Sequence, residues 1–350
     1  MKYKLIAFMA FAASLMMSCT NPMTFETKVH EDGSLDKTVV LEKTDSARIQ
    51  NNIFSINEQA GWSVNIQELP PDKTEDKRKK EFKIQFQKHF SNVEEMNKVL
   101  DKPSDAQFQI NSKFEKKFRW FYTYIRYSET FRPVNRFKMV LPGDYFNRED
   151  NAFLDRLPAE GKAISKADSL YLQLLNEKIS DHFAAMGIFT EQYSIMEEVI
   201  KRNGLGNNWL DTLQKNQEFI YNHIDKMKGD PHFGEKIADS LKIPLHKPKS
   251  SRDFADLSAN LNNRIDFMSF ARDGKYQNVI DMPWKVVGSN ADSVSGTKLY
   301  WHPLVTKFIY RDYEMFAESR KLNLWACLLS VVIISGTIYL FLRRRPSMGK

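Results

Sequence analysis

Two serine–lysine pairs have the spacing of a nucleophile and its base. Ser34 with Lys37, and Ser295 with Lys298, fit the pattern S-x-x-K, in which a lysine one helical turn after a serine can take up the hydroxyl proton. Both pairs fall in stretches that read as β-hairpins, where this spacing does not bring the two side chains together. Because the chain is rich in serine and lysine, we interpret both matches as chance.

The other reactive side chains also lack a catalytic or metal-binding pattern. The sequence has no G-x-S-x-G, no phosphate-binding glycine loop and no H-E-x-x-H. His223 lies on the apolar face of an expected helix, and His182 and His232 have no cysteine, histidine or aspartate at ligand spacing. We therefore predict no catalytic residue, no metal and no cofactor. A non-enzymatic protein is favoured, and a hydrolase whose site is assembled by the fold is the alternative.

The cysteine near the N-terminus predicts a lipid anchor. Lys2 and Lys4 precede an apolar stretch too short to cross a membrane, and the stretch ends in Ser18-Cys19. This is the pattern of a secretory signal peptide, residues 1–18, followed by a lipobox whose cysteine is acylated. The alternative is an ordinary signal peptide with an incidental cysteine.

A second anchor is predicted at the other end of the chain. Residues 322–342 contain no charged side chain, which matches the ~20 apolar residues that a membrane-spanning helix needs. Arg343, Arg344 and Arg345 open a basic tail, 343–350, which the positive-inside rule keeps in the cytoplasm. We expect a bacterial inner-membrane protein with a lipidated N-terminus and most of its chain in the periplasm.

The stretch before this span contains acids that could suggest an acid site. Asp312, Glu314 and Glu318 lie among three bases within residues 311–321. We interpret this stretch as a solvated helical stalk that leads into the membrane.

The charge balance outside the anchors argues against a nucleic-acid partner. The chain has 51 basic and 44 acidic residues, and six of the bases lie in the two terminal segments. The remainder is nearly neutral, whereas nucleic-acid binding needs a basic face. Cys327 lies inside the expected span, so no disulfide can form within the rest of the chain.

The first part of the chain, 19–142, has the patterns of an α+β domain. An Asp-Gly turn joins two apolar runs, which predicts a hairpin, and a helix is expected to begin at Ser46. A capping box at Ser91–Glu94 predicts another helix. Alternating apolar residues predict these strands: 25–29, 35–41, 62–66, 82–86, 106–114 and 118–131.

The aromatic tract 118–127 has two interpretations. Its rings could form a stacking platform or an apolar face that contacts lipid. A long central strand with one buried face explains the same residues, and we favour that structural interpretation.

After Gly143 the apolar spacing becomes helical for about a hundred residues. We predict a helical insertion, 143–247, followed by residues 248–310, in which one helix precedes a strand hairpin formed by 278–287 and 297–301. The expected fold is therefore α+β, with an antiparallel sheet and flanking helices, an all-helical insertion and one C-terminal transmembrane helix.

Several of these features together have a recognisable layout. They are Cys19, an early hairpin at 29–34, a late segment at 282–291, and one C-terminal span with a basic tail. The layout resembles that of the LppM-type bacterial lipoproteins over residues 19–130 and 276–345. The resemblance implies an envelope-anchored, lipid-binding module without a catalytic motif.

Three hypotheses of function follow. The leading one is a binding or assembly module for a membrane lipid or a membrane protein partner. The second is the hydrolase named above. The third is a subunit whose transmembrane helix packs within a larger complex through the small residues Ser330, Ser335 and Gly336.

Overall fold

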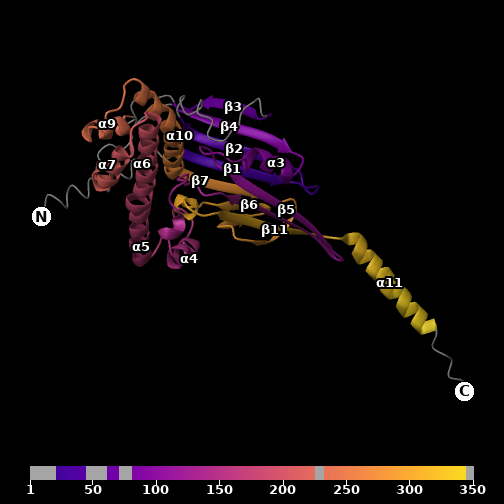
Figure 1. The fold of residues 1–350 in the computed structure, drawn as a ribbon. Helices are drawn as coiled ribbons and strands as arrows, with labels where there is room; N and C mark the ends of the chain where they lie inside the picture. Colours follow the sequence, from indigo (N-terminus) through magenta and orange to yellow (C-terminus); the bar gives the residue numbers. More distant parts are fainter. Residues whose placement is uncertain (1–20, 45–60, 71–80, 225–231, 344–350) are drawn as a thin grey trace, which may run out of the picture.

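The computed structural model describes residues 21–44, 61–70, 81–224 and 232–343. The expected signal peptide, Cys19, the helix expected from Ser46, and Arg344 with Arg345 lie outside these residues. The described chain has a mixed α+β fold, as the sequence predicts, with two sheets and a group of helices (Figure 1).

The larger sheet has seven strands in the order β3-β4-β2-β1-β7-β10-β9. All its neighbouring strands are antiparallel except β1 and β7, which run parallel. The predicted Asp-Gly hairpin joins β1 to β2, and Gly33 at its turn has a φ of 96°, which favours glycine. The strands are β1 (Asn21–Val29), β2 (Leu35–Thr44), β3 (Ser63–Glu68), β4 (Phe82–Phe90), β7 (Gly274–Asp281), β9 (Ser293–Ser295) and β10 (Lys298–Trp301).

The smaller sheet has four antiparallel strands in the order β5-β6-β11-β8. These are β5 (Ile110–Arg119), β6 (Tyr122–Phe131), β8 (Lys285–Ser289) and β11 (Tyr313–Leu322). The two sheets pack face to face as a sandwich around one apolar core, in which Phe25 of β1 meets Phe131 of β6 edge to face at 5.1 Å between ring centres.

The prediction of a helical stalk at 311–321 is wrong. Tyr313–Leu322 is strand β11, which lies between β6 and β8. Met315, Ala317 and Ser319 are buried on one face, and the opposite face carries Phe316 and the charged residues Glu314, Glu318 and Arg320. The period of two is present in the sequence, but the outward-facing acids and bases resemble the surface of a solvated helix.

The strand expected at 278–287 is interrupted at Pro283. Its first half is β7 in the larger sheet, and its second half is β8 in the smaller one. Proline has no backbone N–H to donate to a ladder, so a strand cannot continue unbroken through it in the middle of a sheet. The expected return of strands to the N-terminal sheet is confirmed by β7 and β10.

Helix α3 (Val93–Leu100) begins one residue later than the capping box predicted. Asn92 is the N-cap, and its side chain accepts a hydrogen bond from the N–H of Glu95. The carboxylate of Glu95 accepts in return from the N–H and hydroxyl of Ser91. Glu95 thus takes the part expected of Glu94, but its carboxylate bonds to the residue before the N-cap and not to the N-cap itself.

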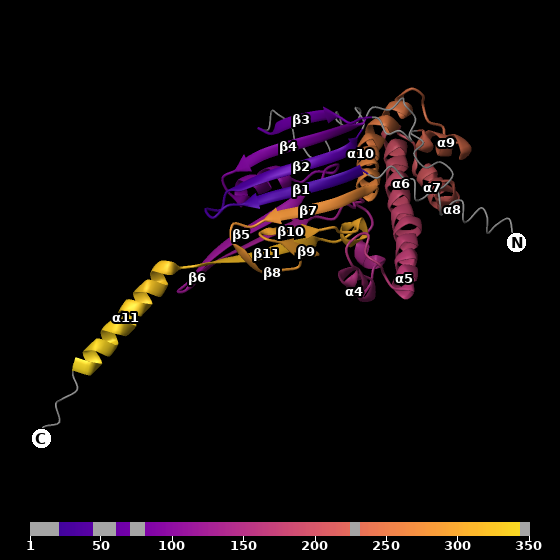
Figure 2. The same ribbon diagram turned by 180° about the vertical axis from the view of Figure 1, so that it is seen from behind.

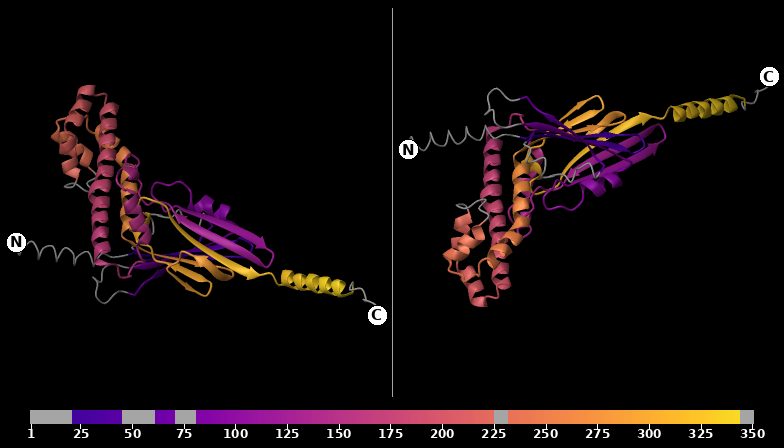
Figure 3. Two further views of the ribbon diagram at one scale, coloured as in Figure 1. Left: turned by 90° about the horizontal axis from the view of Figure 1, so that it is seen from below. Right: turned by 90° about the horizontal axis from the view of Figure 1, so that it is seen from above.

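The remaining helices, apart from α11, lie at one end of the sandwich (Figures 2 and 3). Two further apolar clusters hold them, one around Ile220 and Phe254 and one around Phe153 and Phe183. They are η3 (Pro142–Asp144), α4 (Arg148–Arg156), α5 (Lys166–Glu177), the π-helical η4 (Lys178–Ala184), α6 (Ala185–Arg202), α7 (Asn207–Lys215), α8 (Gln217–Ile224), α9 (Phe233–Ser240), α10 (Lys249–Arg272) and η6 (Val305–Phe308).

Helix α11 (Leu324–Arg343) extends from the opposite end of the sandwich (Figure 1). The helix has 20 residues, and by length and apolar composition it could cross a membrane. Most of its surface is exposed. Arg343 is its last residue.

Candidate functional site

A largely apolar cavity of about 230 Å³ lies where the helices meet the sandwich. We call it the junction pocket. The chain after β6 forms one wall, and η4, α6 and α10 form the others. Its apolar lining includes Val134, Phe137, Ile179, Phe183, Ala184, Ala185, Ile188, Ile265, Met268 and Ile309, and its polar lining consists of Asn135, Ser180, Ser269 and Arg272.

The π-helical turn η4 supplies one wall of this pocket. It joins α5 to α6 and contributes Ile179, Phe183 and Ala184 to the lining. A π-helical turn adds a residue to the helical repeat, and such turns are frequent at functional sites. The small side chains of Ala184 and Ala185 lie next to Phe183 and leave the space that a larger residue would fill.

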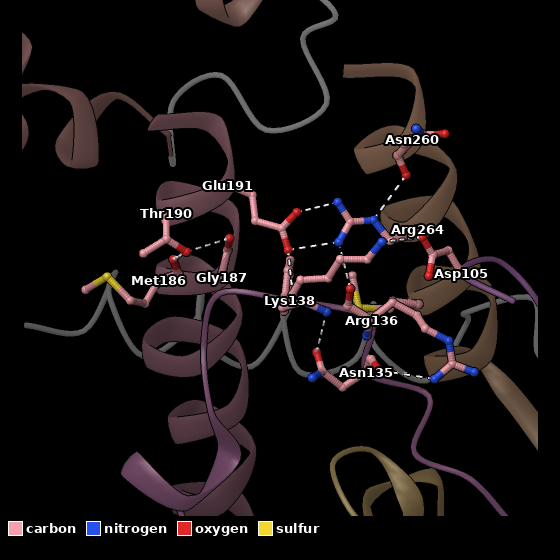
Figure 4. Close-up of polar contacts among 12 residues, drawn as sticks. Asp105, Asn135, Arg136, Lys138, Met186, Gly187, Thr190, Glu191, Asn260 and Arg264 are labelled. Carbon is pink, nitrogen blue, oxygen red and sulfur yellow. Dashed lines mark hydrogen bonds and ion pairs between the residues drawn. The ribbon is translucent and has the colours of Figure 1, made fainter. Parts of the chain in front are cut away.

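A buried ion pair fixes the neighbouring wall (Figure 4). Arg264 of α10 donates two hydrogen bonds to Glu191 of α6, one of them at 2.9 Å from Nη1 to Oε1. The same Nη1 donates to the carbonyl of Arg136 at 2.8 Å, and Oε1 of Glu191 accepts from the N–H of Lys138 at 2.8 Å. The pair thus joins two helices to the loop that follows β6.

Arg136 places a second, half-buried charge beside the pocket. It lies between two lining residues, and its N–H contacts the sulfur of Met268 at 3.2 Å. Its guanidinium donates to the carbonyls of Gln107 and Asn135 and lies over the ring of Phe267. Burial lowers the pKa of Arg136 to about 10, so the side chain stays charged at neutral pH.

The second notable surface lies at the base of α11. Phe118, Trp120 and Phe121, which we call the aromatic tip, form the end of the β5–β6 hairpin and are 56%, 45% and 47% exposed. Trp120 donates from its indole to the hydroxyl of Ser330 at 2.8 Å, and Phe118 stacks on Trp325. The tip therefore lies against the first two turns of α11.

Asn323 joins the tip to α11. Its side chain donates to the carbonyls of Arg119 and Trp120 and accepts from the hydroxyl of Thr123, and its N–H donates to the carbonyl of Phe121. These four bonds hold the start of α11 against the hairpin.

The aromatic tract is divided between the core of the sandwich and the surface. Ile125 and Tyr127 are buried in the sandwich, as the structural interpretation requires. The hairpin turn falls at Trp120 and Phe121, later than the sequence predicts, so the first rings of the tract are exposed.

Neither serine–lysine pair forms a catalytic arrangement. The hydroxyl of Ser34 donates to Asp32, whereas Lys37 is buried between the sheets and donates at 2.8 Å to each carboxylate oxygen of Glu129. Ser295 and Lys298 are direct cross-strand partners on β9 and β10, so for this pair the expectation that the hairpin keeps the two residues apart is wrong. The ammonium group of Lys298 pairs with Glu26. That both matches are chance stays a prediction.

None of the three histidines considered from the sequence is among the residues that line the junction pocket. His223 contacts the carbonyl of Phe219 in its own helix at 2.7 Å and is partly buried. His182 is exposed on η4, and His232 lies 3.6 Å from Glu235. Among the described residues, one three-residue group has metal-ligand geometry, and it contains His30 and His89, which the sequence analysis did not single out.

The junction pocket was not predicted from the sequence. Its walls come from residues 134–137, 179–188, 265–272 and Ile309. Each segment by itself has the sequence pattern of an ordinary core segment. The segments surround one cavity only because the helices pack on the sandwich.

Comparisons with known proteins add little. Neither protein-family models nor curated protein sequences give a match. Among solved structures, the chain is similar to the NMR structure of the folded domain of LppM from Mycobacterium tuberculosis, with a TM-score of 0.28 and 5% identity over 87% of this chain and 91% of that one. This neighbour belongs to the family that the sequence layout resembles, and at this TM-score the likeness carries no argument about function.

Proposed function

We propose that this protein is a membrane-tethered, non-enzymatic module of the bacterial envelope that binds the acyl chain of a lipid in the junction pocket. The observation that carries the proposal is the junction pocket, an apolar space between the helices and the sandwich with a few polar groups in its lining. Concave, mostly apolar cavities of this kind are where proteins bind apolar ligands. Arg272 in the lining favours a ligand with an anionic head.

Two features would tether the protein to the membrane: helix α11 and a lipid on Cys19. Helix α11 would cross the inner membrane with Arg343–Arg345 in the cytoplasm, and Cys19 would carry acyl chains on the periplasmic side. A spanning helix makes dissociation from the membrane negligible. The sandwich would then face the periplasm. Because β1 begins beside the end of α10, at the helical end of the sandwich, acyl chains on Cys19 would hold that end near the membrane as well.

The hydrolase alternative receives no support from the lining of the pocket. Ser180 and Ser269 offer hydroxyls, but none of the described lining residues is a histidine, a lysine or a carboxylate that could act as their base. A role for α11 in helix packing stays open as a second candidate. Gly336 has open space around it, so another helix could approach there, whereas the hydroxyl of Ser330 is engaged by Trp120.

The experiment that tests the proposal is photo-cross-linking with a diazirine-bearing fatty acid. The full chain is placed in phosphatidylcholine nanodiscs, irradiated and digested, and the labelled peptides are identified by mass spectrometry. We expect labels on 179–188 and 265–272, besides those on α11 that contact with bulk lipid produces. Labelling confined to α11 and the aromatic tip would contradict the proposal.

Two matched variants sharpen this experiment. Ala184→Phe adds a ring to the lining of the junction pocket and should strongly reduce labelling of its walls. Ala255→Phe adds the same ring at an exposed position of α10 and should leave the labelling unchanged. Equal labelling of the two variants would show that the fatty acid does not occupy the pocket.

A further inference from the structure

We propose that His30, Asp36 and His89 form a binding site for a divalent transition-metal ion such as Zn²⁺. One potential ligand atom from each side chain lies within 4.8 Å of the other two. Asp36 is central: its Oδ2 is 2.7 Å from Nε2 of His30, and its Oδ1 is 2.7 Å from Nδ1 of His89. We call this group the histidine cluster.

The strand register explains why three residues so far apart in sequence meet. Asp36 of β2 and His89 of β4 are direct cross-strand partners. Their chain neighbours Leu35, Lys37 and Phe90 are buried in the sandwich, so Asp36 and His89 project from its outer face. Two neighbours on one face of an antiparallel pair have their Cβ atoms about 5 Å apart, so the ends of both side chains can reach the same point.

The turn between β1 and β2 places the third ligand. The N–H of His30 donates to the carbonyl of Ser34, and the carbonyl of His30 accepts from the N–H of Gly33. These bonds close the hairpin directly beside Asp36. All three ligands therefore stand on hydrogen-bonded strands or on a closed turn, which is the rigid support that a metal site needs.

The donor set suits a transition metal. Two imidazole nitrogens and one carboxylate oxygen are typical ligands of zinc, and three protein ligands leave a fourth position open. The hydrogen bond from His89 holds the pKa of Asp36 below its usual range, so this carboxylate is ionised at neutral pH. A bound ion would replace the protons that now lie between the carboxylate and the two rings.

The other histidine–acid pairs in the described chain provide a contrast. His302 lies 4.0 Å from Asp292, and His232 lies 3.6 Å from Glu235. Neither pair has a second imidazole within the distance that would complete a site, so each serves as an internal control. A plain ion pair is the alternative for the histidine cluster as well, and it predicts no preference for a metal.

The location of the cluster links it to the membrane end of the sandwich. Glu31 follows His30 and accepts hydrogen bonds from Lys321, near the end of β11, and from Trp284. Lys321 lies two residues before Asn323, which anchors α11. An ion in the cluster would therefore hold β1, β2 and β4 together at the end of the sandwich from which α11 extends.

The test is calorimetric titration of Zn²⁺ into the full chain, held in nanodiscs of zwitterionic phosphatidylcholine after treatment with a chelator. We expect one saturable site per chain. Asp36→Asn and His89→Ala should each weaken binding at least about tenfold, because even outer-shell changes cost 10–100-fold. His302→Ala should bind as the wild type does. Absence of saturable binding, or equal binding by His89→Ala, would overturn the proposal.

A second readout separates loss of a ligand from loss of structure. Cu²⁺ bound to the wild type should give an electron paramagnetic resonance spectrum with hyperfine coupling to two imidazole nitrogens, and His30→Ala should leave one. His30 is partly exposed, so this variant is expected to keep the fold. Coupling to two nitrogens in His30→Ala would place the ion elsewhere.

Discussion

Lys37 carries its charge into the core between the two sheets, where it meets Glu129 of the facing sheet. Thr27 also accepts from its ammonium group, and Tyr127 donates to Glu129 at 2.8 Å. Burial and the neighbouring carboxylate raise the pKa of Tyr127, so the phenol stays protonated and can donate. The period of two in the sequence places Lys37 on the same face as Leu35 and Val39, but no local pattern identifies Glu129, far along the chain, as its partner.

Breaking this ion pair on one side should destabilise the fold strongly. Glu129→Gln leaves Lys37 buried without a carboxylate, and removal of one partner of a buried pair costs about 3–5 kcal/mol. The double variant Lys37→Met/Glu129→Leu should recover most of that loss, since two apolar residues can replace a buried pair at little cost. Urea unfolding of the full chain in detergent, followed by tryptophan fluorescence, measures both. A double variant as unstable as Glu129→Gln would contradict this account.

At the scale of elements, the sequence predicts what depends on local patterns. The β1–β2 hairpin, α3 and the helix expected within residues 248–310 follow from turn residues, caps and periodicity, and each is present. The β5–β6 turn was misplaced because Trp120 and Phe121 are not turn-forming residues, and β11 was missed because its exposed face is charged. Where the local sequence pattern and the pairing of a strand with its neighbours favoured different structures, the strand pairing determined the structure.

The contact between α6 and the loop after β6 depends on a glycine. A Cβ on Gly187 would lie 2.5 Å from ring atoms of Phe137, which lines the junction pocket. Gly187→Ala should therefore displace that ring and destabilise the fold by about 1–3 kcal/mol, as overpacking does. Gly143→Ala is the control, because a Cβ there meets nothing within 4 Å. Urea midpoints that are equal for the two variants would argue against this close contact.

At the scale of the whole molecule, the two ends of the sandwich differ in character. The aromatic tip and α11 lie at one end, and the helices with the junction pocket lie at the other (Figures 1 and 3). The sequence predicted the α+β class and the apolar C-terminal helix. It did not predict two sheets, because strand patterns state which residues are buried and leave open which strands share a sheet.

The aromatic tip should be immersed in the membrane interface. Trp120 bonds to Ser330, six residues into α11, which at 1.5 Å per residue is about 9 Å along the helix. If α11 spans the bilayer, the tip reaches the interfacial layer that aromatic rings prefer. A nitroxide on Phe121→Cys, in a Cys327→Ser background, should be more accessible to oxygen than to a nickel chelate. A nitroxide on Ser240→Cys, at the end of α9, should show the reverse, and equal values at both sites would place the tip in water.

The central claim is that a membrane-tethered chain holds a lipid in the junction pocket, and native mass spectrometry tests it most directly. The full chain is released from detergent micelles under conditions that strip loosely bound lipid. We predict one retained lipid per chain in the wild type and in Ala255→Phe, and none in Ala184→Phe. A wild-type spectrum without bound lipid, or a lipid that Ala184→Phe retains equally, would contradict the account.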